Sequence, residues 1–79
     1  MKNYKGLIKN IFLETKVNPD IPFAARNEIW KIELSWGRKA IEEYGHNEEY
    51  MKNIYQISLC PIIKKYDIRD YFDIEFYIN

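Results

Sequence analysis

The chain holds few residues that could do catalytic or metal-binding chemistry, and they are scattered. Glu43 and His46 have the Glu-x-x-His spacing of di-metal helical bundles. Such sites use the motif on two helices, whereas this chain has one histidine. A structural zinc site needs four ligands of the Cys or His type, and Cys60 is the only cysteine. We therefore interpret the Glu43–His46 segment as a solvated corner between helices and predict no metal and no cofactor.

Nucleophilic catalysis has no complete set of residues either. Cys60 has apolar neighbours and no adjacent base that would lower its pKa, so we expect a buried, inert thiol. Ser35 or Ser58 could be combined with His46, but no nucleophile-elbow sequence surrounds either serine. A phosphate-binding loop needs clustered glycines, and the three here are far apart: Gly6, Gly37 and Gly45. We predict that the protein is not an enzyme.

An acidic group near the C-terminus is the first candidate for binding a partner. Its members are Asp67, Asp70, Asp73 and Glu75, accompanied by Tyr71 and Tyr77. Three-residue spacing keeps the aspartates close together on a helix. A metal-dependent nuclease would draw its ligands from several segments, so the simplest interpretation is helix capping on a solvated surface. The functional interpretation that we carry forward is a docking surface for a locally basic protein, with the tyrosines as anchors.

A basic group supplies the alternative of nucleic-acid binding. Its members are Lys2, Lys5 and Lys9, which form a strip at helical spacing, and Arg38 and Lys39, which follow Trp36 and Gly37. Cations beside aromatic rings could hold phosphates and stack bases. The formal net charge is zero, however, and dedicated nucleic-acid-binding domains are strongly basic. Nucleic acid is therefore the second choice.

The charges are also split along the chain. Up to Ile41 there are eight basic and four acidic residues, and from Glu42 onward there are four basic and eight acidic residues. Such a division concerns partners and solubility more than fold. It makes self-association through the two halves a further option.

Composition limits the class of protein. The 79 residues make one domain, 1–79, and an aromatic content of 16% supplies a core without disulfides. A lone cysteine fits a reducing compartment, and no apolar stretch approaches the roughly 20 residues of a membrane span. We therefore expect a cytoplasmic protein without a membrane partner. Heavy use of Ile, Lys, Asn and Tyr suggests an AT-rich genome, as in many low-GC bacteria and their phages.

Apolar spacing predicts mainly helices. Tyr4, Leu7, Ile8, Ile11 and Phe12 mark one face of a helix over residues 3–14. Asn18-Pro19-Asp20 breaks the chain, with Asp20 as a cap for the next helix. Gly45 closes that helix, Asn47 caps a third, and Pro61 limits its end. Asp67 could cap a last short helix.

Two segments are open to a second interpretation. Trp30–Trp36 alternates apolar and polar residues like a half-buried strand, although Phe23–Tyr44 as a whole also fits a helix. Phe72–Ile78 alternates in the same way. We favour a small bundle of about three helices with a possible C-terminal strand. The alternative is an α+β domain that pairs these two strands. Trp30 lies on the inward side in either case, so we predict that it belongs to the core.

These observations favour a protein-binding module. We expect an inhibitor, an immunity-type factor or a regulatory factor of phage or mobile-element origin that sterically occludes a partner protein.

Overall fold

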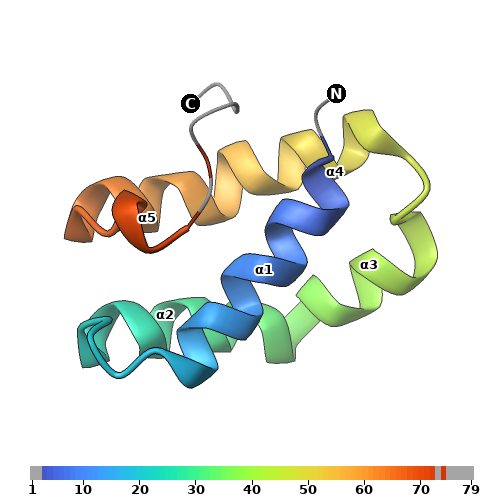
Figure 1. The fold of residues 1–79 in the computed structure, drawn as a ribbon. Helices are drawn as coiled ribbons and strands as arrows, with labels where there is room; N and C mark the ends of the chain where they lie inside the picture. Colours follow the sequence, from blue (N-terminus) through green and yellow to red (C-terminus); the bar gives the residue numbers. More distant parts are fainter. Residues whose placement is uncertain (1–2, 73, 75–79) are drawn as a thin grey trace.

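The computed structural model describes residues 3–72 and Ile74, and these form three helices with no strand (Figure 1). The predicted helical bundle is therefore confirmed. The first helix, α1, covers Tyr4–Val17 and so continues beyond the predicted end. The side chain of Asn3 caps it by accepting the Gly6 N–H at 2.9 Å. The Glu48 carboxylate accepts the Tyr4 N–H at 3.1 and 3.2 Å, which ties the start of α1 to the third helix.

The second helix is continuous but changes its winding. It consists of α2 (Phe23–Ile32), a π-helical turn η1 (Glu33–Gly37) and α3 (Arg38–Tyr44). The strand interpretation of Trp30–Trp36 is therefore wrong. The alternation misled because Trp30 and Leu34 face solvent, whereas Ile29, Glu33 and Gly37 recur four residues apart on the buried side. Asp20 is not the cap, since Pro22 holds that position and makes no side-chain cap.

The third helix follows the same design. It consists of α4 (Glu48–Ile54), a π-helical turn η2 (Tyr55–Leu59) and α5 (Cys60–Tyr66). Asn47 caps it as predicted, by accepting the Tyr50 N–H at 3.0 Å. Pro61 lies inside this helix rather than at its end, contrary to the prediction. A proline lacks an N–H and clashes with the carbonyl one regular turn earlier. The preceding π turn has wider i to i+5 bonding, as from the Cys60 N–H to the Tyr55 carbonyl, and this makes room for the ring.

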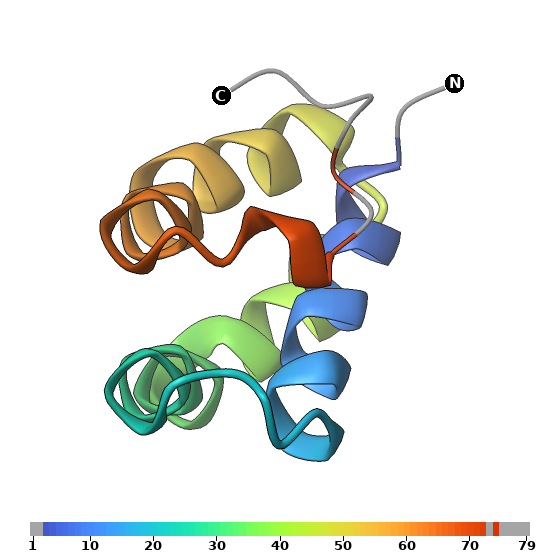
Figure 2. The same ribbon diagram turned by 60° about the vertical axis from the view of Figure 1, so that its left-hand side comes forward.

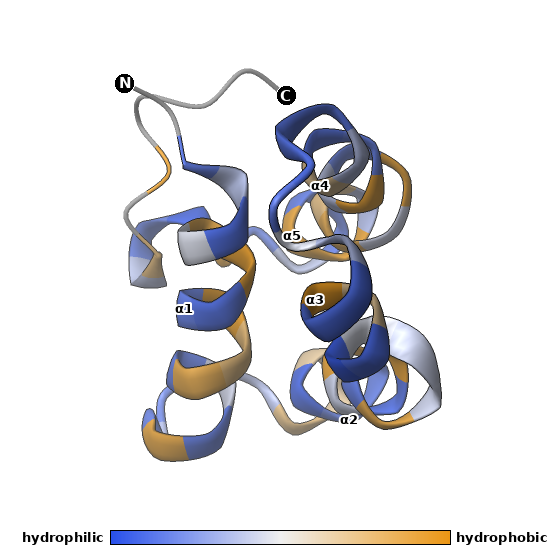
Figure 3. Cartoon of the chain, turned by 90° about the vertical axis from the view of Figure 1, so that its right-hand side faces the viewer, coloured by the Kyte–Doolittle hydropathy of each residue, from blue (hydrophilic) through white to orange (hydrophobic). Residues whose placement is uncertain are grey.

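The two long helices form one antiparallel layer, and α1 lies across it. α2 contacts α5, α3 contacts α4, and α1 packs against both α2 and α4 (Figures 1 and 2). α1 turns apolar residues toward the long helices in Figure 3. A short 3-10 turn, η3 (Arg69–Tyr71), brings the chain back against α1, as Figure 2 shows. The core at this junction includes Ile8, Ile11, Ile29, Met51, Tyr55, Leu59, Ile68, Phe72 and Ile74.

The predicted C-terminal strand lies mostly outside the described residues. Of Phe72–Ile78, the structure describes Phe72 and Ile74, and both are buried in the core. Their alternation therefore marks inward-facing residues, and the strand remains a prediction.

Gly37 lies directly against Phe12 of α1, with no room for a side chain. A Cβ at this position would lie 2.8 Å from Phe12 Cζ and 3.1 Å from the Ile32 carbonyl oxygen. Because Phe12 is itself buried, we expect Gly37→Ala to lower the free energy of unfolding by about 1–3 kcal/mol, the usual cost of overpacking. Gly6→Ala is the comparison, since the three atoms nearest its Cβ, at 3.0–3.4 Å, all belong to the exposed Asn3 side chain, which can move aside. Urea denaturation of both variants tests this, and an unchanged midpoint for Gly37→Ala would contradict it.

Candidate docking groove

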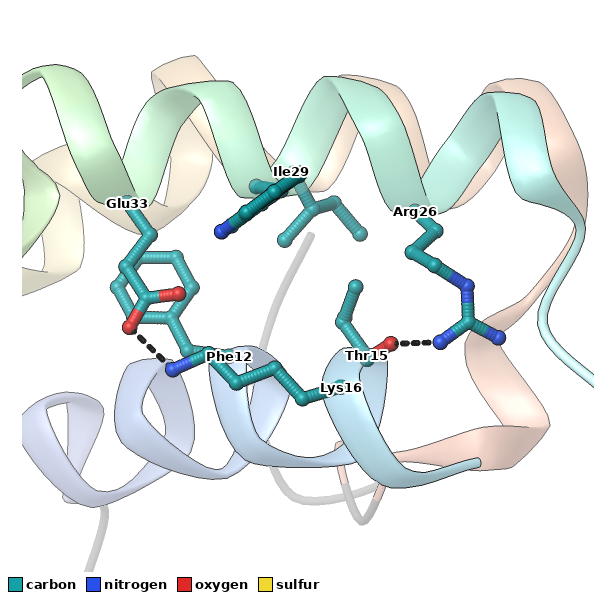
Figure 4. A pocket seen from close by; sticks show the side chains of 7 residues that line it. Phe12, Thr15, Lys16, Arg26, Ile29 and Glu33 are labelled. Carbon is teal, nitrogen blue, oxygen red and sulfur yellow. Dashed lines mark hydrogen bonds and ion pairs between the residues drawn. The ribbon is translucent and has the colours of Figure 1, made fainter. Parts of the chain in front are cut away.

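A hollow of about 400 Å³ opens between α1 and α2, and Figure 4 shows its side chains converging from the two helices. Phe12 and Ile29 are buried and form its apolar floor. Thr15 is also buried. Its hydroxyl donates to the Ile11 carbonyl at 2.6 Å within α1, so this polar group is already paired. The full lining consists of Phe12, Thr15, Lys16, Arg26, Ile29, Trp30 and Glu33.

Trp30 forms one wall of this hollow and is 50% exposed. The prediction that Trp30 is a core residue is therefore wrong. On the regular turns of α2, Trp30 follows the buried Ile29 by about 100° of rotation, which moves its indole from the core to the edge of the hollow. A half-exposed tryptophan beside an apolar floor is a typical anchor of a protein interface.

Arg26 holds the loop that forms one end of the hollow. Its guanidinium donates to the Asn18 carbonyl at 2.7 Å, to the Ile21 carbonyl at 3.3 Å and to the Thr15 carbonyl. These carbonyls belong to the end of α1 and to the following turn, where helix termini leave acceptors unpaired. Arg26 thus fixes the geometry of the α1–α2 connection.

Glu33 is the one buried charged residue in the described part of the chain, with 7% of its side chain exposed. It lies in the π turn η1 and accepts from Lys16 Nζ at 2.7 Å. Arg38 approaches the same oxygen at 3.5 Å. A buried carboxylate is costly unless it is paired, so Lys16 is committed to Glu33.

The same ion pair also lines a second hollow, of about 350 Å³. Phe12, Lys16 and Glu33 line both hollows, so the two lie side by side on α1 and the second helix, and we call the pair the docking groove. The second hollow is lined in full by Lys9, Phe12, Leu13, Lys16, Glu33, Arg38, Ile41 and Glu42. It brings together Lys9 and Arg38 from the predicted basic group. Lys5 and Lys39 are exposed but line neither hollow, and Lys2 lies outside the described residues.

The predicted acidic surface is described in part. Asp67 does not cap a new helix but ends α5 in a left-handed conformation, with φ of 52°. The Ile68 N–H bonds to the Ile63 carbonyl and the Asp67 N–H to the Lys64 carbonyl, which is a Schellman motif. Asp70 and Tyr71 are exposed on η3. Asp73, Glu75 and Tyr77 lie outside the described residues.

A polar contact joins α2 to α5, at the end of the long helices that is opposite the turn at residues 45–47. Tyr66 Oη donates to the Glu28 carboxylate, and Lys65 Nζ lies 3.3 Å from the same oxygen. The Tyr66 hydrogen bond, followed by Lys65, lowers the pKa of Glu28, and Glu28 in turn raises the pKa of Tyr66. All three groups have structural partners and offer no unpaired reactive group.

The remaining candidates for chemistry are dispersed. Cys60 is buried, as predicted, and His46 is exposed in the turn between the long helices. Among residues 3–72 and Ile74, no three His, Cys, Asp or Glu side chains are grouped closely enough to hold a metal ion. Within the same residues, none of the helices combines the length and apolar character that crossing a membrane requires.

The docking groove was missed by the sequence interpretation because its residues come from two helices that cross. One signal was present: Ile29, Glu33 and Gly37 recur four residues apart, and a charged residue in a buried series needs a distant partner. Nothing local to Glu33 identifies Lys16 as that partner. Comparison of the chain with protein-family models, with curated proteins and with solved structures finds no match.

Proposed function

We propose that the protein is a small protein-binding module whose docking groove receives side chains of a partner protein. Binding would occlude the partner sterically, as an inhibitor, an immunity-type factor or a regulatory factor of phage or mobile-element origin would do. The observation that carries the proposal is the open groove with an apolar floor and a half-exposed Trp30 at its edge. Tryptophan and arginine beside such a floor are the residues that dominate interface energetics.

The shape of the groove favours a stretch of polypeptide over a compact ligand. Either hollow alone lies near the lower end of the roughly 300–1,000 Å³ of small-molecule pockets. Both are open, and they are neighbours that share Phe12 and the Lys16–Glu33 pair in their linings. Leu13, which lines the second hollow, adds exposed apolar surface on α1. A chain segment can use such an extended, interrupted surface, with side chains in each hollow.

Site-specific photocrosslinking in the cells that encode the protein tests this proposal. We would place benzoylphenylalanine at Leu13, which is exposed and lines the second hollow. The matched control carries it at Ile57, which is 76% exposed on the third helix and lines neither hollow. The expected result is one defined protein adduct from position 13 and none from position 57. Equal adducts at both positions, or none at position 13, would contradict the proposal.

Nucleic-acid association is the second candidate, because Lys9 and Arg38 line the same hollow. If phosphates bound there, the logarithm of the association constant would fall linearly with the logarithm of salt concentration. Loss of each phosphate-contacting cation would then lower that slope by about one. Binding of an oligonucleotide by the wild type and by Lys9→Gln, measured over a salt series, distinguishes this candidate from protein binding.

A further inference from the structure

We propose that the docking groove recognises an acidic, amphipathic helical segment, with an apolar anchor in the first hollow and carboxylates at the second. This inference rests on the proposed function and names the chemistry of its partner. It differs from the sequence-based hypothesis, in which an acidic surface of this protein binds a basic partner.

The charges that line the docking groove are predominantly positive. Its two hollows include four cationic side chains and two carboxylates: Lys9, Lys16, Arg26 and Arg38 against Glu33 and Glu42. The excess belongs to the basic N-terminal part of a chain whose formal net charge is zero. Complementary charge at the edge of an interface selects partners and accelerates their association.

Two of these cations are available to a partner. Lys16 is held by Glu33 at 2.7 Å, and Arg26 donates to three backbone carbonyls. Arg38 Nη2 donates to Glu33 Oε2 over a long 3.5 Å, and 62% of the Arg38 side chain is exposed, so its remaining N–H donors can pair with a partner's carboxylate. Lys9 is exposed and forms no ion pair with the described residues. Both available cations line the second hollow.

Trp30 and the two available cations belong to different hollows of the groove. Trp30 and Ile29 line the first hollow, and Arg38 lines the second. At about 1.5 Å per residue, the second helix advances roughly 12 Å from Trp30 to Arg38. A partner helix that places an aromatic or aliphatic side chain against Trp30 would therefore present its carboxylates about two turns away. An amphipathic helix in a groove is a common mode of peptide recognition.

The same features make nucleic acid a poorer occupant. Glu33 lines both hollows and Glu42 lines the second, so a continuous phosphate backbone would pass two carboxylates. The buried floor of Phe12 and Ile29 lies below the rim and offers no donor to a phosphate. A peptide can match this arrangement, because its carboxylates need lie only beside Arg38 and Lys9.

Fluorescence anisotropy with two labelled helical peptides tests the proposal. Both peptides span about four turns and carry the same Leu and Phe stripe. One has Glu at every charged position, the other Lys, and oligothymidylate of similar length is the third probe. We expect the Glu peptide to bind at least about tenfold more tightly than the Lys peptide at low salt. Lys9→Glu/Arg38→Glu should reverse this preference, whereas Lys64→Glu/Arg69→Glu, an equal change in charge outside the groove, should preserve it.

Thermal melts of each variant report whether it folds. If the double reversal unfolds, Lys9→Gln/Arg38→Gln replaces it, and the preference should then disappear rather than reverse. Equal binding of both peptides, tighter binding of the Lys peptide, binding of neither, or displacement of the Glu peptide by oligothymidylate would each overturn the proposal. A position-13 adduct whose crosslinked segment is basic would overturn it while leaving the protein-binding function intact. Absence of that adduct would remove the proposed function itself.

Discussion

Tyr55→Ala is expected to lower the free energy of unfolding by about 3–5 kcal/mol, the range for a large aromatic side chain truncated in a core. Tyr55 is fully buried in the π turn η2, and its ring centroid lies 6.0 Å from that of Tyr4 on α1. The cavity would therefore open where α1 meets the third helix. Small domains have only about 5–15 kcal/mol of stability in total. The loss is therefore a large fraction of that total, and the unfolded fraction should increase. Urea denaturation followed by circular dichroism measures the change.

Ile57→Ala is the matched control, because Ile57 lies in the same π turn but is 76% exposed. We expect a change within about 0.5 kcal/mol, as for most surface substitutions. If the two alanine variants lost similar stability, the loss would reflect the helix itself rather than the core contact of Tyr55.

The hydroxyl of Tyr55 gives the fold a dependence on alkaline pH. Burial, followed by the neighbouring Cys60 thiol, raises the pKa of Tyr55 above its usual value. The unfolded chain therefore releases this proton more readily than the folded protein. The resulting stability is fully present below pH about 10, the pKa of an unfolded tyrosine, and is lost as the pH rises beyond it. Tyr55→Phe should show a shallower loss of stability above that pH, measured by urea midpoints across a pH series.

Trp30→Ala is expected to weaken partner binding by at least about thirtyfold, which corresponds to a hot-spot residue worth roughly 2 kcal/mol. Because Trp30 is half exposed at the edge of the docking groove, its free energy of unfolding should change by about 1 kcal/mol or less. The partner identified through the position-13 adduct would be titrated against both proteins by calorimetry.

Phe23→Ala provides the comparison on the same helix. Phe23 is 79% exposed at the start of α2 and lines neither hollow. Its removal should leave the dissociation constant within about threefold of the wild-type value. A large loss of stability in Trp30→Ala would show that Trp30 contributes to the core. Equal effects of Trp30→Ala and Phe23→Ala on binding would show that Trp30 is not a specific anchor in the groove.

Local patterns in the sequence predicted the helices better than the groove. The spacing of Tyr4, Leu7, Ile8, Ile11 and Phe12 predicted the buried face of α1, and Asn47 predicted the start of the third helix. Both signals act over a few residues. Trp30 was misplaced because regular periodicity and strand alternation both treat apolar residues as inward-facing. The Lys16–Glu33 pair depends on how α1 crosses the second helix, and no neighbouring residue reports that crossing.

The two π turns also affect how the long helices tolerate a change in length. Each turn accommodates one more residue than a regular α-helical turn, so the residues after it are rotated by about 100° relative to an uninterrupted helix. α2 and α3 thereby both direct small or apolar residues inward, Ala25 and Ile29 before the turn and Ala40 after it. A deletion of one residue within η1 would remove the extra residue and restore uniform winding while keeping Ala40 on the buried face, whereas regular winding of the undeleted sequence would rotate Ala40 by about 100° away from its neighbours. The π turns thus let each long helix carry one additional residue without moving the buried face that follows, and we expect a one-residue deletion to be tolerated within η1 and not within the regular turns of α2 or α3.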